Sequence, residues 1–158
     1  MKRYTTTDLF KPKIHQKWYV LANRSDAVIY FEGKDHQFHF VDRLDNPSGH
    51  LTEGELDSDR SGSTFSTATL FHHSLDRHNE KREQIAIRFA ARIGKFLARA
   101  ARANKFEEVT LIAEPHFLGI LKEKLPSSVH QKKIHSLGRE YSRGSMEEVR
   151  GKILNALG

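Results

Sequence analysis

The sequence contains no cysteine, so it can form neither disulfide bonds nor thiolate metal sites. A protein without disulfides fits a reducing compartment, and we expect a cytoplasmic location. Long apolar runs are also absent, because no stretch approaches the roughly eighteen residues that a membrane-spanning helix needs. Residues 1–17 lack the apolar core of a secretory signal. The sequence therefore predicts a soluble protein with no membrane span.

Hydrophobic residues make up only 37% of the chain, whereas charged residues make up 29%. The 26 lysines and arginines outnumber the 20 acidic residues, which gives a formal net charge of +6. A chain of 158 residues is long enough to bury the core of one domain. Its positive charge favours polyanionic partners such as RNA, DNA or acidic lipid, without choosing among them.

The first half of the chain divides into an arm, three strands and a loop. Residues 1–16 are polar and basic, and we expect a flexible basic arm. A single α/β domain is expected over residues 17–158. Aromatic and β-branched runs separated by turn residues predict an antiparallel meander of strands, over residues 17–23, 27–32 and 36–44. Residues 45–79 are rich in glycine, serine and threonine and predict a long polar loop.

Residues 80–104 predict a long amphipathic helix around which the domain is organised. Apolar residues recur at three- and four-residue steps, as one helix face requires. Five basic residues fall within an arc of roughly 80° beside that face, at about 100° per residue. Glu80 and Glu83 lie outside this arc. We call the five residues the basic stripe: Arg88, Arg92, Lys95, Arg99 and Arg102.

The remaining segments complete an α/β order. Residues 107–113 are almost continuously apolar, which predicts a strand buried on both faces, beside a parallel neighbour and with helices on each side. A helix is expected over residues 116–124, a strand within residues 129–137 and a final helix after the capping box at Ser145 and Glu148. The order βββαβαβα predicts a mixed five-stranded sheet with packed helices, as in ribonuclease H-like domains.

Catalytic and metal-binding patterns are weak. Two-metal phosphoryl transfer needs several converging carboxylates, but the first strand contains no acid. Glu114 alone follows a central strand and is a weak catalytic candidate. The acidic segment at residues 57–62 starts like a calcium loop, but Ala68 replaces the glutamate at its twelfth position.

Histidines 72, 73 and 78 fall in the expected polar loop and lack the spacing of metal ligands. His116, beside Glu114 at the start of a helix, has a repelling acid where an anion would bind. We therefore predict no metal ion and no cofactor.

Several segments in order carry a family resemblance: residues 17–33, 45–49 and 59–62, Phe89 with Ala90, and residues 109–121. Together they resemble the bacterial host attachment proteins, described as required for attachment to host cells. The resemblance covers residues 18–157. More distantly, such proteins are similar to the middle domain of eukaryotic and archaeal peptide-chain release factors, which implies a comparable fold.

The release-factor motif is Gly-Gly-Gln followed by a helix that reads Ser-Ala-x-Arg-Phe. Gln84, Ala86, Arg88 and Phe89 match its Gln, Ala, Arg and Phe, while Arg82 and Glu83 replace the two glycines. Neither replacement allows the backbone freedom of glycine. The resemblance thus leaves Gln84 as a weak catalytic candidate and implies a basic helix that faces RNA.

Three functions follow from these patterns. The leading hypothesis is a non-catalytic protein that binds RNA or the ribosome through the basic stripe, where neutralised phosphates release counterions. The alternative is an interaction protein that supports attachment, with a host-cell factor as partner. The third is a hydrolase of the peptidyl-tRNA type with a degenerate motif. A solvated helix face that keeps the protein soluble also explains the stripe.

Overall fold

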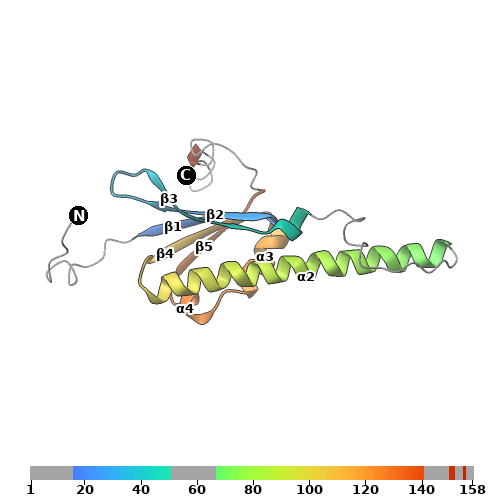
Figure 1. Ribbon diagram of the computed structural model, residues 1–158. Coiled ribbons are helices and arrows are strands. Elements are labelled where there is room, and N and C mark those ends of the chain that lie inside the picture. The colour runs from blue at the N-terminus through green and yellow to red at the C-terminus, as the bar shows by residue number, and fades with distance from the viewer. Residues whose placement is uncertain (1–15, 51–66, 141–149, 152–154, 156–158) are drawn as a thin grey trace.

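The computed structural model describes residues 16–50, 67–140, 150, 151 and 155, and for residues 50 and 67–74 only the backbone. In this part of the chain five strands form one mixed sheet in the order β3-β2-β1-β4-β5 (Figure 1). The predicted α/β class and mixed five-stranded sheet are therefore confirmed. The strands are β1 (Lys17–Ala22), β2 (Asp26–Glu32), β3 (Phe38–Asp45), β4 (Glu108–Ala113) and β5 (Lys133–Gly138).

The meander and the parallel half of the sheet meet at β1. This strand pairs antiparallel with β2 and parallel with β4, and β4 pairs parallel with β5. Its register aligns Val20 with Ile29 on one side and with Leu111 on the other. The predicted burial of β4 on both faces, beside a parallel neighbour, is confirmed, because Val109 and Leu111 face one core and Ile112 the other.

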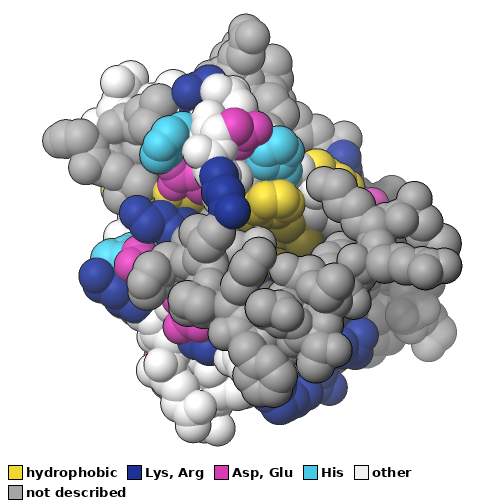
Figure 2. Space-filling model, turned by 90° about the vertical axis from the view of Figure 1, so that its left-hand side faces the viewer, with side chains coloured by type: hydrophobic (Ala, Val, Ile, Leu, Met, Phe, Trp, Pro, Cys, Tyr) yellow, Lys and Arg dark blue, Asp and Glu magenta, His cyan; other side chains and the backbone are white. Residues whose placement is uncertain are grey.

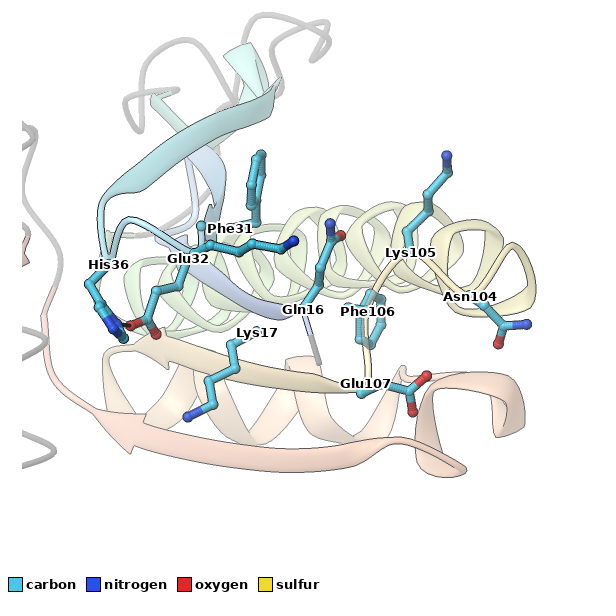
Figure 3. A pocket seen from close by; sticks show the side chains of 11 residues that line it. Gln16, Lys17, Phe31, Glu32, His36, Asn104, Lys105, Phe106 and Glu107 are labelled. Atoms are coloured by element: carbon cyan, nitrogen blue, oxygen red, sulfur yellow. Dashed lines mark hydrogen bonds and ion pairs between the residues drawn. The ribbon is translucent and has the colours of Figure 1, made fainter. Parts of the chain in front are cut away.

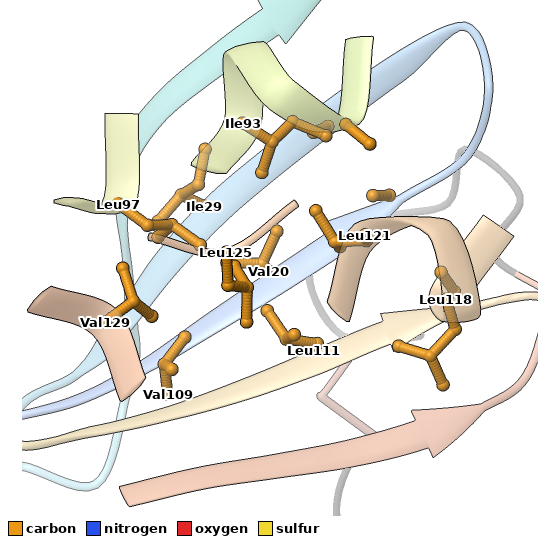
Figure 4. Packing of buried hydrophobic residues seen from close by; sticks show 14 of the residues in the cluster. Val20, Ile29, Ile93, Leu97, Val109, Leu111, Leu118, Leu121, Leu125 and Val129 are labelled. Atoms are coloured by element: carbon orange, nitrogen blue, oxygen red, sulfur yellow. The ribbon is translucent and has the colours of Figure 1, made fainter. Parts of the chain in front are cut away.

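Helices were expected on each side of β4, but the helices labelled in Figure 1 cover one face of the sheet. Figure 1 shows α2 (Thr67–Arg102), α3 (Pro115–Glu123) and α4 (Ser127–His130) on the same side, with the first turns of α2 projecting beyond the sheet. A short 3-10 turn, η2 (Pro47–His50), follows β3. Side chains of α2, α3 and α4 interlock with the sheet in the main core, as Ile93, Leu121 and Val129 do in Figure 4.

Several expected boundaries differ from the structure. The helix α2 begins at Thr67, so residues 67–79, expected as the end of a polar loop, are helical. This stretch contains neither proline nor glycine, and extending a helix costs far less than nucleating one. His78 is accordingly buried, with 6% of its surface exposed, rather than lying in a polar loop. Val129 belongs to α4, so the last strand begins at Lys133.

Other expectations lie outside the described residues. These are the arm at residues 1–15, the acidic segment at residues 57–62 and most of the final helix at residues 145–157. The side chains of His72 and His73 are also outside this set.

Candidate functional site

The basic stripe lies on an exposed face of α2. All five of its side chains are exposed, whereas Phe89, Ile93 and Leu97 on the neighbouring face are buried. The predicted separation of a core face from a charged face therefore holds over this part of α2. Burial of the apolar face fixes the helix against the sheet, which also fixes the direction in which the stripe points.

One stripe residue has a structural contact. The guanidinium of Arg92 donates a hydrogen bond to the main-chain oxygen of Asp45 (2.7 Å), and its Cζ lies 5.3 Å from the centre of the Phe89 ring. Arg92 therefore connects α2 to the end of β3. Within the described part of the chain, no hydrogen bond or ion pair involves the side chains of the other four stripe residues, Arg88, Lys95, Arg99 and Arg102.

The acid on α2 closest in sequence to the stripe is engaged elsewhere. A Glu83 oxygen lies 3.0 Å from Nε2 of His116, which places this carboxylate against the start of α3. Four stripe cations therefore face solvent without compensation from a described carboxylate. Such a concentration of one charge attracts anions to the surface.

The two weak catalytic candidates occupy structural positions. Gln84 is exposed on a regular turn of α2. Glu114 caps α3, because its side-chain oxygens accept hydrogen bonds from the main-chain nitrogens of His116 (3.0 Å) and Phe117 (2.7 Å). Among the described residues, no three histidine or acidic side chains gather as a metal site.

The groups with shifted pKa values lie in and around the β2–β3 hairpin. Burial raises the pKa of Tyr19, and the neighbouring Glu32 carboxylate, which accepts its hydroxyl hydrogen bond (3.0 Å), raises it further. Burial also raises the pKa of Tyr30. The main-chain N–H of Gln37 and then the His39 side chain lower the pKa of the Asp35 carboxyl. The tyrosine pKa values are thus raised mainly by burial, whereas the Asp35 pKa is lowered by local hydrogen bonds.

Sequence reasoning missed a cavity of about 600 Å³ at the end of the sheet where β1 and β4 begin (Figure 3). Its walls come from the start of β1, the β2–β3 turn and the link between α2 and β4. Lys17, Lys34 and Lys105 line it. These lysines are far apart in the sequence, so no local motif contains them. The sequence shows only that each lies at or near an end of an expected helix or strand.

The fold and the stripe define a small α/β protein with a basic helical surface. The chain belongs to the family of proteins required for attachment to host cells, because the family's model matches residues 18–153. A comparison with curated proteins found no match. Of the helices in the described ranges, none combines the length and the apolar character needed to cross a membrane.

Proposed function

We propose that the protein binds RNA, either free or on the ribosome, through the basic stripe, and that it catalyses no reaction there. The observation that carries the proposal is the set of four exposed stripe cations that no carboxylate of the described residues neutralises. From Arg88 to Arg102 the helix rises about 21 Å. That length spans several phosphates of one strand, each a potential ionic contact.

The burial of α2 argues for a nucleic acid over acidic lipid. Amphipathic helices bind a bilayer by inserting their apolar face. Here that face packs against the sheet, with Phe89, Ile93 and Leu97 at 2% exposure or less. A rigid row of charges remains for contact with a polyanion. The distant resemblance to a release-factor domain favours RNA over DNA, and a cytoplasmic location is part of this proposal.

The test is a charge reversal at Arg99 and Arg102, which are exposed and make no described side-chain contact. The matched control reverses Lys122 in the last turn of α3 and Lys124 at its C-cap, which are also exposed, with the same change in net charge. Binding of a fluorescent single-stranded RNA is measured over a range of salt concentrations. For the wild type we expect log affinity to fall linearly with log salt, at a slope of about 0.7 per neutralised phosphate.

R99E/R102E should bind more weakly and with a shallower salt dependence, because phosphate contacts are lost. K122E/K124E should lose much less. Equal losses in the two variants would mean that net charge alone draws the RNA, and the stripe would then not be the binding surface. Circular dichroism of both variants verifies that they fold.

The family match favours a second candidate, an interaction protein that supports attachment to host cells through a host-cell factor. A strain without the gene would be complemented with the wild type or with R99E/R102E, and its adhesion to host cells measured. If both proteins restore adhesion, attachment does not require the basic stripe. If only the wild type restores adhesion, attachment requires the basic stripe.

A further inference from the structure

The cavity at the start of β1 and β4 has the dimensions of a small-molecule site. Its volume of about 600 Å³ falls within the range typical of ligand pockets. Figure 2 looks onto this end of the molecule and shows hydrophobic side chains among basic, acidic and histidine side chains. An apolar base with polar groups around it is the usual composition of a pocket that orients a ligand.

The cavity carries a surplus of available positive charge. In the described ranges, the side chains of Lys17, Lys34 and Lys105 take part in no hydrogen bond or ion pair. The two acids that line the cavity, Glu32 and Glu107, are both engaged.

Glu32 accepts the Tyr19 hydroxyl (3.0 Å) and lies 3.3 Å from Nδ1 of His36. Glu107 lies 3.6 Å from Nζ of Lys132. Lys132 thus balances Glu107, whereas Glu32 keeps its charge against three lysines, so the cavity retains a positive surplus and favours an anionic ligand.

Aromatic and amide groups occur beside these cations. Phe31 is partly exposed in the cavity and stacks on His39 at 5.0 Å, while the ring of Phe106 lies beneath at 1% exposure. Gln16 extends between Phe31 and Phe106 (Figure 3). The amide of Asn104 is oriented by a 3.0 Å hydrogen bond from Lys132 to its oxygen. Aromatic faces stack on nucleobases, and amides match the donors and acceptors of base edges.

We propose that this cavity binds a nucleoside phosphate. The base packs against the exposed part of Phe31 with its edge toward Gln16, and the phosphate is held by Lys34 and Lys105. The inference does not depend on the basic stripe, because no stripe residue lines the cavity. A free nucleotide and a nucleotide within an RNA strand share this chemistry. Arg99 and Arg102 in the last turn of α2 precede Lys105 closely, so a strand that follows the stripe reaches the cavity.

The test uses the full chain and its single tryptophan. The Trp18 ring lies 5.1 Å from Phe106, so its fluorescence reports on the floor of the cavity. AMP and ATP are titrated beside adenosine, inorganic phosphate and a short single-stranded RNA, and calorimetry gives the affinities. We expect AMP and ATP to bind more tightly than adenosine or phosphate alone, because the site recognises both parts.

K34A/K105A should weaken AMP and ATP binding roughly tenfold or more, whereas the matched control K122A/K124A should not. F31L, which keeps apolar bulk but removes the ring, should also weaken binding. R88E, which reverses a stripe residue at the opposite end from Lys105, should leave AMP binding intact, which distinguishes this site from the stripe. If only the RNA binds, and binds more weakly to K34A/K105A, the nucleotide comes from a strand. Wild-type affinity of K34A/K105A for every probe, or no binding of AMP, ATP and RNA to the wild type, would overturn the proposal.

Discussion

Arg92 differs from the rest of the basic stripe because its side chain holds two parts of the fold together. It donates to the main-chain oxygen of Asp45 and lies over the Phe89 ring. We expect R92A to lower the free energy of unfolding by about 1–2 kcal/mol, through loss of one charged hydrogen bond and one cation–π contact. Urea denaturation measures the change. R88A is the matched control and should stay within about 0.5 kcal/mol; equal effects would remove the structural role of Arg92.

Tyr19 and Tyr30 predict a loss of stability at alkaline pH. The pKa of each is raised in the folded protein, by burial first and, for Tyr19, also by Glu32. A raised pKa means that the contribution is fully present below the ordinary tyrosine range, near pH 10, and is lost as pH rises toward the folded value. Phenolate absorbance should show these two tyrosines ionising late, together with unfolding. Early ionisation of all four tyrosines in folded protein would contradict this.

In Y19F the hydroxyl is absent, so the alkaline loss of stability should be smaller than in the wild type. At neutral pH the variant loses the hydrogen bond to Glu32, which is worth about 1 kcal/mol or more for a charged acceptor. Its stability curve against pH should therefore start lower and fall less steeply. A curve parallel to that of the wild type would assign the alkaline effect to other groups.

At the scale of elements, two helical glycines predict opposite effects of the same substitution. A Cβ at Gly94 would lie 2.5 Å from the main-chain oxygen of Lys124, where α2 meets the end of α3, whereas a Cβ at Gly119 meets nothing within 4 Å. G94A should therefore destabilise by about 1–3 kcal/mol, since backbone must move. G119A should stabilise by up to about 1 kcal/mol through helix propensity. Thermal denaturation compares the stabilities of the two variants. If both variants are more stable than the wild type, the backbone at the α2–α3 contact can move at little cost in free energy.

The elements themselves were largely predictable, because burial imposes periods that the sequence displays. The meander, the core of α2, β4 and α3 all follow from alternation or from three- and four-residue spacing. The start of α2 was not predictable, because residues 67–79 include residues of low helix propensity. They are helical because extending an existing helix costs less free energy than starting one. The exposure of the basic stripe could be anticipated, since the same spacing that buries Ile93 turns Lys95 outward.

At the scale of the molecule, the cavity could not be predicted from the sequence. Lys17, Lys34 and Lys105 become neighbours because β1 pairs with both β2 and β4, which aligns Lys17 with Glu32 and with Glu108. No local pattern contains that pairing. The hydrogen bond from Arg92 to Asp45 depends in the same way on tertiary contact. A site on one helix face can be predicted from spacing, whereas a site between elements requires the sheet order.

The net charge of +6 and the basic stripe together predict a trade-off between stability and binding. Lys95 lies three residues after Arg92 and four before Arg99, so each neighbour repels it on the helix surface. K95E replaces two repulsions by two attractions, each worth about 0.2–0.5 kcal/mol, and should raise the free energy of unfolding by about 1 kcal/mol at low salt. High salt should diminish the gain, and K95Q should show about half of it.

The same K95E variant should bind RNA more weakly than the wild type, because a phosphate contact is replaced by a repelling carboxylate. Denaturation without RNA and a binding titration on the same preparation give both quantities. A higher free energy of unfolding together with a lower RNA affinity would mean that the charge of Lys95 contributes to binding and not to the stability of the fold. If K95E is neutral or destabilising at low salt, the stripe charges are already compensated within the protein, and the reason for proposing a polyanionic partner disappears.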